Sequence, residues 1–398
     1  MAGSDRKAGK KRRQSNWPLR FILLAVFLSY VLVAIVVPVV RAQSVMAGKR
    51  LDVTVEWILL NSMAWFLGAW FFYVGCCLGS FLNVVAYRLP NGLTLLGSSR
   101  CSYCLVNISS RHNLPIFGWF TIRGRCQTCR LPISCRYLIV ELLAGLLLLL
   151  LFFLELVQDG SHLPTDHRYR IHDLFRTAAT GHPNQLLQMD WSLLRIFFVH
   201  SLLGYALFTG GLMRMDGFQL PSGWKAFHWL AIFIMIAIWP LDFEFARSPF
   251  QAVHQVPPIV QRFDFQLFGW LVGTLIGLQF SNLFRVRGSG VVFSMGLLGV
   301  GFGLSATISI GILFWCLVVI GLLTGLKRIV IGHTLFVLLV AFLLQLGCWD
   351  VLSSLPFWPH ASASPLTLVG FLAPGSVAVI LAIFYRKQVQ KGSPDAEA

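Results

Sequence analysis

The sequence predicts an all-α polytopic membrane protein with about ten transmembrane helices and a cytoplasmic four-cysteine zinc-binding loop. Hydrophobic residues make up 56% of the 398 residues and charged residues only 12%, which is about half the charged fraction of a soluble protein. Mean hydropathy is +0.72. Several apolar stretches are long enough to cross the hydrocarbon core of a bilayer, which is about 30 Å thick. This composition excludes intrinsic disorder, collagen and a disulfide-rich secreted scaffold.

Ten mainly apolar stretches are predicted to span the membrane. They cover residues 21–40, 57–82, 138–157, 193–213, 224–241, 265–284, 291–306, 308–326, 329–348 and 366–385. Two places are less regular than the rest, because stretch 224–241 ends in Trp239-Pro240 and stretches 291–306 and 308–326 almost touch. No internal repeat is present in the sequence.

The distribution of Lys and Arg predicts the orientation, because basic residues collect on the cytoplasmic side. The first 20 residues hold seven basic side chains, and segment 83–137 holds seven Arg with no Asp or Glu. Because successive spans cross the membrane in opposite directions, ten spans place both termini and segment 83–137 in the cytoplasm. The expected location is the inner membrane. The same bias accounts for the net charge of +16, so the bilayer is the expected partner and nucleic acid is not. A cleaved signal peptide is a weaker interpretation of stretch 21–40, whose apolar run is long for a signal core.

Four cysteines in the cytoplasmic loop have the spacing of metal ligands. Cys101 and Cys104 form one C-x2-C pair, and Cys126 and Cys129 form a second pair 21 residues later. Each pair can point two thiolates at one ion, and two pairs close a tetrahedral site that suits zinc. Disulfide bonds are disfavoured because the cytoplasm is reducing. A site with four protein ligands is predicted to be structural, and Cys135 is predicted to be a spare thiol.

Other polar residues in the apolar stretches have simpler expected roles. Glu155 falls near an outer boundary and is expected to be a solvated helix end. His200 and His228 stand alone in their stretches and are expected to form hydrogen bonds within the helix bundle.

Residues 75–143 carry five motifs in a fixed order. Residues 75–90 read G-C-C-L-G-S-F-L-N-V-V-A-Y-R-L-P, and the two C-x2-C pairs follow. Residues 113–120 read N-L-P-I-F-G-W-F, residues 123–126 read R-G-R-C, and residues 132–143 read P-I-S-C-R-Y-L-I-V-E-L-L. This order resembles the bacterial prepilin leader peptidase/N-methyltransferase family. The matching motif positions are Gly79, Ser80, Phe81, Asn83, Arg88, Pro90, Arg136, Tyr137 and Glu141.

The resemblance implies a bifunctional membrane enzyme. Members of the family cleave the leader from type IV prepilins and type II secretion pseudopilins at the cytoplasmic face, and then methylate the new N-terminus with S-adenosylmethionine. The implied mechanism is that of an aspartic endopeptidase, in which one carboxylate acts as base towards water and the other as acid towards the carbonyl. For Glu141 the resemblance implies a structural role or one near the methyl donor, and pairing with an arginine such as Arg136 stays open beside it.

The predicted spans and the resemblance together divide the chain into four expected parts, of which residues 1–56 and about 330–398 lie outside the resemblance. Residues 1–56 are a basic tail with an extra transmembrane anchor, and residues 57–157 are the prepilin-peptidase N-terminal region with the zinc loop at 83–137. Residues 193–326 are a peptidase-like transmembrane region. Residues 327–398 are additional helices followed by a short polar tail.

The first catalytic motif of the family, D-x-D/E-x-x-x-L-P-D, is altered in this chain. Residues 212–222 read L-M-R-M-D-G-F-Q-L-P-S. Aligning the L-P pair puts Arg214 at the catalytic aspartate and Asp216 at the second, non-catalytic acidic position. A shift by two residues would make Asp216 the catalytic residue, so Asp216 is the candidate for that role.

The second motif, G-x-G-D, is altered as well. Gly288 and Gly290 match its glycines, but Val291 stands where the aspartate is expected, and no Asp or Glu occurs from 265 to 349. Neither valine nor a permanently protonated arginine can act as a general base. We therefore expect a pseudoenzyme with impaired cleavage that binds hydrophobic segments of prepilins or pseudopilins. The alternative is a non-catalytic binding or assembly factor of a pilus or secretion system.

Overall fold

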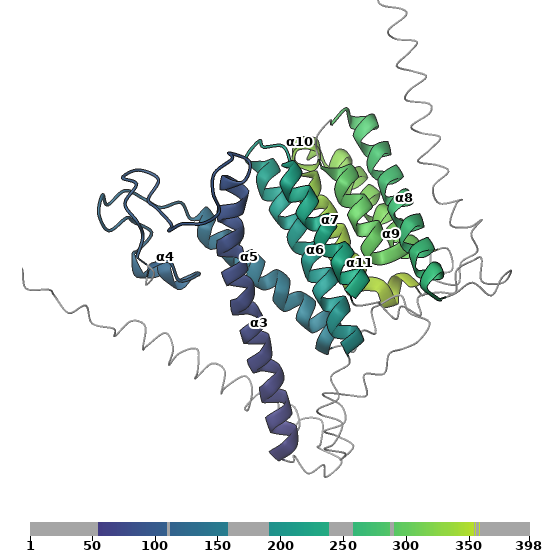
Figure 1. Cartoon of the computed structure of the whole chain (residues 1–398), viewed down its shortest axis with the longest axis horizontal. Helices are drawn as coiled ribbons and strands as arrows, with labels where there is room; N and C mark the ends of the chain where they lie inside the picture. Colours follow the sequence, from purple (N-terminus) through teal and green to yellow (C-terminus); the bar gives the residue numbers. More distant parts are fainter. Residues whose placement is uncertain are drawn as a thin grey trace, which may run out of the picture. The chain divides into compact units, whose positions relative to one another are not determined.

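A computed structural model of the protein describes residues 55–109, 112–157, 191–238, 258–286, 290–353, 355 and 358. These residues are mostly helical, with two isolated β-bridges in the cysteine loop (Figure 1). The chain divides into two compact units, Met1–Leu67 and Gly68–Ala398, and the second contains all the sites below. The predicted spans 21–40 and 366–385 lie outside the described residues.

The helices follow the predicted apolar stretches. The long ones are α3 (Val55–Arg88), α5 (Arg136–Leu151), α6 (Trp191–Met215), α7 (Ser222–Ile238), α8 (Pro258–Phe284), α9 (Val291–Leu323) and α11 (Thr334–Ser353). Two short helices are α4 (Phe117–Thr121) and α10 (Lys327–Gly332). Within the described ranges, five helices are long and apolar enough to cross a membrane. The total of about ten spans and their orientation remain predictions.

Two of the predicted spans are joined in a single kinked helix. Helix α9 covers 291–306 and most of 308–326, ending at Leu323, and its break lies at Gly303, which has φ 74° and ψ −172°. Glycine accepts this conformation because it has no Cβ to clash with the backbone. The predicted span 224–241 corresponds to α7, which has 17 residues and is shorter than the five candidate spans.

Helices α3 and α5 approach each other closely through small residues. A Cβ atom at Gly79 would lie 2.6 Å from Ala144 Cβ and 2.9 Å from Glu141 Cα, and one at Gly75 would lie 2.8 Å from the Ala144 carbonyl oxygen. The four-residue spacing of the two glycines puts them on one face of α3. The glycines of the first motif therefore allow the close contact that fixes both ends of the cysteine loop.

Helices α8 and α9 form a second close pair (Figure 1). A Cβ atom at Gly273 would lie 2.2 Å from the Met295 carbonyl oxygen, and one at Gly269 would lie 2.2 Å from the Gly299 carbonyl oxygen. The next glycine on this face, Gly277, would place a Cβ 2.6 Å from a backbone Cα of α9. The backbones themselves are in contact along this face, as in other glycine-lined membrane helices.

The prediction that Glu155 is a solvated helix end is wrong. Helix α5 continues as a π-helical turn over Phe152–Val157, and Glu155 is only 1% exposed there. Its Oε1 lies 2.5 Å from Nδ1 of His200, whose ring stacks on Phe302 with centroids 4.2 Å apart. His200 and His228 are both hydrogen-bonded within the bundle, as expected, His228 through the Trp224 carbonyl at 2.8 Å.

Candidate functional site

The four predicted metal ligands lie on two turns of the same shape. In each turn the backbone N–H of the first cysteine donates to the carbonyl of the residue five positions later. The N–H of the residue after the second cysteine donates to the carbonyl of the first cysteine. The four bonds are Cys101 N–H to Val106 O (3.0 Å), Leu105 N–H to Cys101 O (3.0 Å), Cys126 N–H to Leu131 O (2.9 Å) and Arg130 N–H to Cys126 O (3.0 Å). Each turn is closed by an isolated β-bridge. This local geometry follows from the C-x2-C spacing and aims both thiols of a turn at one point.

The four sulfur atoms have the spacing of a tetrahedral metal site. All four lie within 4.8 Å of one another, and the pairs Cys101–Cys129 and Cys104–Cys126 are each separated by 3.8 Å. A tetrahedral ion with metal–sulfur bonds of about 2.3 Å, as for zinc, keeps its sulfurs about 3.8 Å apart. The cluster can therefore hold a metal ion, and its dimensions are consistent with zinc. Cys135 is exposed and is not one of the four clustered cysteines.

Backbone amides of the turns favour the thiolate form of two ligands. The N–H groups of Cys129 and Thr128 lower the pKa of the Cys126 thiol to about 6. The N–H groups of Cys104 and Tyr103 lower the pKa of Cys101 in the same way. The Leu131 N–H lowers the pKa of the Cys129 thiol, but burial and the neighbouring sulfurs together have the larger effect and raise this pKa to about 12. Some of the four crowded thiols therefore lose their protons readily, while others keep them. Neighbouring thiolates repel one another, and a bound divalent cation would offset this repulsion.

Glu141 connects the cysteine loop to the membrane helices. Its side chain is buried, and its Oε2 accepts the backbone N–H of Ile116 at 2.7 Å. Helix α3 lies directly against this residue, since a Cβ atom at Gly79 would lie 2.9 Å from Glu141 Cα. Ile116 has φ 60°, a conformation rarely adopted by a β-branched residue, and the bond to Glu141 helps to hold it. The structure therefore gives Glu141 a loop-anchoring contact, and the alternative of pairing with Arg136 is wrong.

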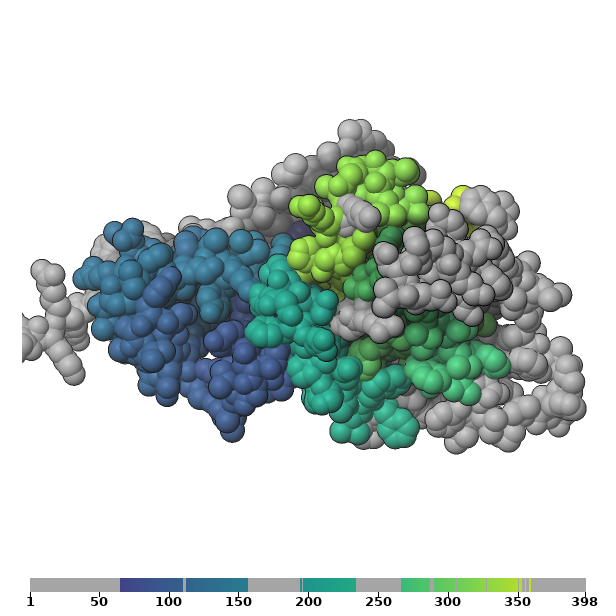
Figure 2. All heavy atoms as spheres, turned by 90° about the horizontal axis from the view of Figure 1, so that it is seen from above, coloured from purple at the N-terminus to yellow at the C-terminus, as the bar shows by residue number. Residues whose placement is uncertain are grey.

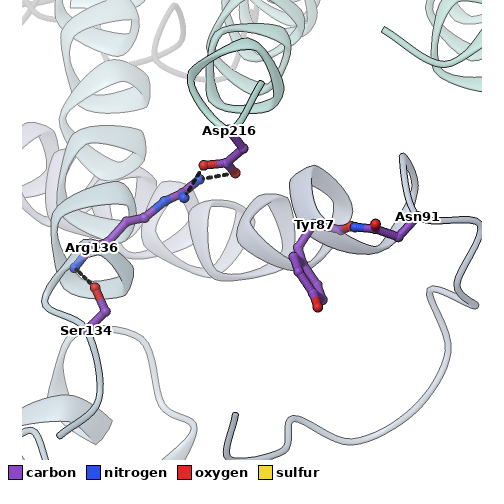
Figure 3. Close-up of polar contacts among 5 residues, drawn as sticks. All are labelled: Tyr87, Asn91, Ser134, Arg136 and Asp216. Atoms are coloured by element: carbon purple, nitrogen blue, oxygen red, sulfur yellow. Dashed lines mark hydrogen bonds and ion pairs between the residues drawn. The ribbon is translucent and has the colours of Figure 1, made fainter. Parts of the chain in front are cut away.

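Arg136 instead binds Asp216, which lies 80 residues later in the chain (Figure 3). The guanidinium at the start of α5 reaches both carboxylate oxygens of Asp216, just after α6, with Nη2 to Oδ2 at 2.7 Å. The side chains are 36% and 20% exposed. A two-pronged bond of this kind fixes orientation as well as charge. Sequence reasoning identified both residues but not their pairing, for which the signal was opposite charge at two helix ends predicted to lie on the same side of the membrane.

We expect this ion pair to stabilise the contact between α5 and the segment after α6. Asp216→Asn and Arg136→Gln should each lower the free energy of unfolding in detergent, and a double-mutant cycle should give a coupling of about 1 kcal/mol because the pair is partly exposed. Thermal unfolding followed by circular dichroism measures this. Strictly additive effects of the two substitutions would show that the pair contributes nothing.

The two altered catalytic motifs meet in the structure. Gly290 has φ 79°, and a Cβ atom there would lie 2.3 Å from Leu220 Cδ1. Val291, the first residue of α9, is fully buried, and Arg214 donates to the Phe218 carbonyl at 3.3 Å. Gly288 lies outside the described residues.

A small cavity of about 200 Å³ opens where these segments meet. It is lined by Gln219, Leu220, Lys225, Ser281, Gly290, Val292 and Phe293. None of these lining residues is a carboxylate, and a basic lysine is the one charged residue among them.

The remaining motif residues lie in or near the ends of α3 and α5. Arg88 donates to the Thr94 and Ser98 carbonyls at 3.3 and 3.2 Å, which closes the turn that follows Pro90. Asn83 is buried on α3, and its Nδ2 has no hydrogen-bond partner among the described residues. Phe81 and Tyr137 are exposed.

Comparison with known proteins identifies the segment that carries the cysteine loop. Residues 73–154 match the model of the bacterial peptidase A24 N-terminal domain. The chain is 46% identical over 77 residues to the prepilin leader peptidase/N-methyltransferase of Myxococcus xanthus, a match that covers 19% of this chain and 23% of that protein. It is 34% identical over 117 residues to the protein of that name from Stutzerimonas stutzeri, covering 23% and 40%.

A third protein of that name, from Klebsiella pneumoniae, is 38% identical over 94 residues, covering 22% of this chain and 41% of that protein. The chain thus spans less than half the length of these curated relatives. No solved structure matches the chain. The matches confirm the family resemblance that the motifs of residues 75–143 indicate.

Proposed function

We propose, from the premise that residues 73–154 are a bacterial peptidase A24 N-terminal domain, that the chain is an inner-membrane relative of prepilin leader peptidase in which leader cleavage is impaired. One observation carries this proposal. The candidate catalytic residue Asp216 has both carboxylate oxygens bound to the guanidinium of Arg136. Both oxygens of this carboxylate are therefore engaged in a structural ion pair.

The second motif adds support to the proposal. Acid–base hydrolysis by an aspartic mechanism needs two carboxylates at close range, and Val291 has no proton to give or take. The cavity between the motifs is lined without a carboxylate. Since general acid–base catalysis alone contributes typically 10²–10⁴-fold, a chain without the pair should cleave at least that much more slowly than an intact relative.

Two cofactors belong to this proposal. Zinc would bind Cys101, Cys104, Cys126 and Cys129, where it would hold the loop together without an open coordination position for chemistry. S-adenosylmethionine would serve as methyl donor if methyl transfer is retained, and this rests on resemblance to relatives named N-methyltransferase.

A second candidate function is non-catalytic binding of pilin-like hydrophobic segments in a pilus or secretion system. The contact between Leu220 and Gly290 favours it, because the scaffold still brings the two motif segments together without their acids. This candidate predicts that the native protein retains an uncut precursor on co-purification.

Restoring the two acids tests the proposal. The protein in membranes is mixed with a pilin precursor carrying its leader, and product mass is followed by mass spectrometry. The native protein should leave the precursor uncut, and an Arg214→Asp, Val291→Asp double variant should cleave it. A double variant with Arg214→Asn and Val291→Asn is the matched control, because it has nearly the same shape without the acids. Cleavage by the native protein at the rate of an intact relative would show that the proposal is wrong.

A further inference from the structure

We propose that segment 113–121 of the cysteine loop lies in the headgroup layer of the bilayer, with the neighbouring arginines bound to anionic phospholipids. The inference concerns a lipid-binding surface and does not depend on peptidase or methyltransferase activity. It rests on the depth at which this segment is anchored, on its composition, and on the charge beside it.

The depth of the segment follows from its hydrogen bond to α5. Ile116 N–H lies 2.7 Å from Oε2 of Glu141, and Glu141 is the sixth residue of the candidate span Arg136–Leu156. At 1.5 Å per residue, Glu141 is about 7.5 Å from the start of that span. On α3 the residue that approaches Glu141 is Gly79, and the next residue, Ser80, is about 12 Å from the end of the helix at Arg88 by the same measure. Ile116 therefore lies beside the two spans and not beyond their ends.

This depth corresponds to the polar layer of a bilayer and the outer edge of its hydrocarbon. The headgroup layer on each side is about 5–7 Å thick, and Arg88 and Arg136 at the helix ends are the residues expected to reach its outer boundary. By the helix rise used above, the segment lies about 7–12 Å deeper in the membrane than Arg88 and Arg136. A backbone segment at this depth must contact lipid unless protein covers it.

The segment has the composition of an interfacial element. Residues 113–121 read N-L-P-I-F-G-W-F-T and contain no charged side chain. Phe120 is 55% exposed and Leu114 is 38% exposed, so neither is covered by the described protein. Trp119 is half-buried and donates its indole N–H to the Ile133 carbonyl at 3.3 Å, which fixes the orientation of α4. Aromatic side chains of this kind are enriched at membrane–water interfaces.

Positive charge lies directly next to the segment. Arg123, Arg125 and Arg130 follow it in the loop and are exposed, and within the described part of the chain none of them has an acidic partner. No Asp or Glu occurs anywhere in 83–137, so the loop offers these cations no internal partner. In the space-filling view the cysteine-loop residues, in blue, form one continuous body (Figure 2). An anionic leaflet is complementary to such a surface, because arginines near it bind lipid phosphates.

Photo-crosslinking in lipid nanodiscs tests this proposal. The full-length protein carries p-benzoylphenylalanine in place of Phe120, in discs of phosphatidylcholine alone or with 30% phosphatidylglycerol, a fraction of about one anionic lipid in three. A second sample carries the probe at Leu146, which is exposed on α5 inside the candidate span. We expect lipid adducts at both positions, and a several-fold higher yield at 120 when the anionic lipid is present.

A variant links the result to the anchor. Glu141→Leu removes the acceptor for Ile116 while keeping side-chain size, and should reduce the adduct at 120 several-fold without changing the adduct at 146. Metal content and the adduct at 146 report whether the variant is folded. Absence of lipid adducts at 120 in both discs, equal yields with and without anionic lipid, or transfer of the adduct to an added pilin-like peptide would each overturn the proposal.

Discussion

Chelation of the metal is expected to unfold the cysteine loop and leave the membrane helices intact. The backbone hydrogen bonds of Cys101, Leu105, Cys126 and Arg130 each stay within one turn, and sulfur atoms meet between the turns, so we expect the ion to supply much of the folding free energy of the loop. Once released, the loop should be cut by trypsin at Arg100, Arg123, Arg125 and Arg130, all of which are exposed in the folded protein but held in turns. Mass spectrometry of the fragments measures this, and circular dichroism should show almost no loss of helix.

Two cysteine variants separate ligand loss from a general effect of substitution. Cys126→Ser should reduce bound metal from one ion per chain to near zero and make the loop sensitive to trypsin without chelator. Cys135→Ser is the control, because Cys135 is exposed and is not one of the clustered ligands. Acidification should act like chelation, since the metal needs thiolates. Metal content should therefore fall as the pH is lowered, because protons compete with the metal for the thiolates. A full complement of metal in Cys126→Ser would contradict the assigned ligand set.

Gly273→Leu is expected to force α8 and α9 apart and to destabilise the fold strongly. A Cβ atom at Gly273 would lie 2.2 Å from the Met295 carbonyl oxygen, and backbone cannot move aside as a flexible side chain can. Overpacking of a well-filled contact costs about 1–3 kcal/mol for small changes, and the loss here should exceed that. An unfolding temperature at least about 10 °C lower is expected for the detergent-solubilised protein.

Gly347→Leu is the matched control for this experiment. Gly347 is also a helical glycine, on α11, but a Cβ atom there would meet no other atom within 4 Å. Its variant should unfold close to the native temperature. If both leucine variants lose the same amount of stability, the added side-chain bulk and not the close approach of α8 and α9 would account for the effect.

The sequence was sufficient to predict the metal site and most of the helices. The spacing of Cys101, Cys104, Cys126 and Cys129 is local, and the structure brings all four together as predicted. Long apolar stretches likewise identify helices, because hydrophobic length alone decides whether a segment can span. The position of the break in α9 was not predictable from hydropathy, since Gly303 is one of many glycines in a uniformly apolar stretch.

Partners distant in the chain were harder to predict. Arg136 and Asp216 were each singled out, but the family motif indicated a catalytic role for Asp216, and Glu141 was considered as the partner of Arg136. Glu155 was taken for a solvated end because its depth depends on the π-helical continuation of α5 and on His200, which lies 45 residues away. Such contacts depend on how helices are arranged, and hydrophobic periodicity does not contain that information.

The four cysteine thiols are synthesised before Asp216, and this order indicates the order in which the contacts can form. All four thiols lie within one loop, so a nascent chain that has emerged as far as residue 135 already carries every group needed to trap an ion. The Asp216 carboxylate, which binds Arg136, is synthesised 80 residues after Arg136 and follows α6. The metal-bound turns can thus form while the inserted chain is still short, and the ion pair then joins the start of α5 to the segment after α6.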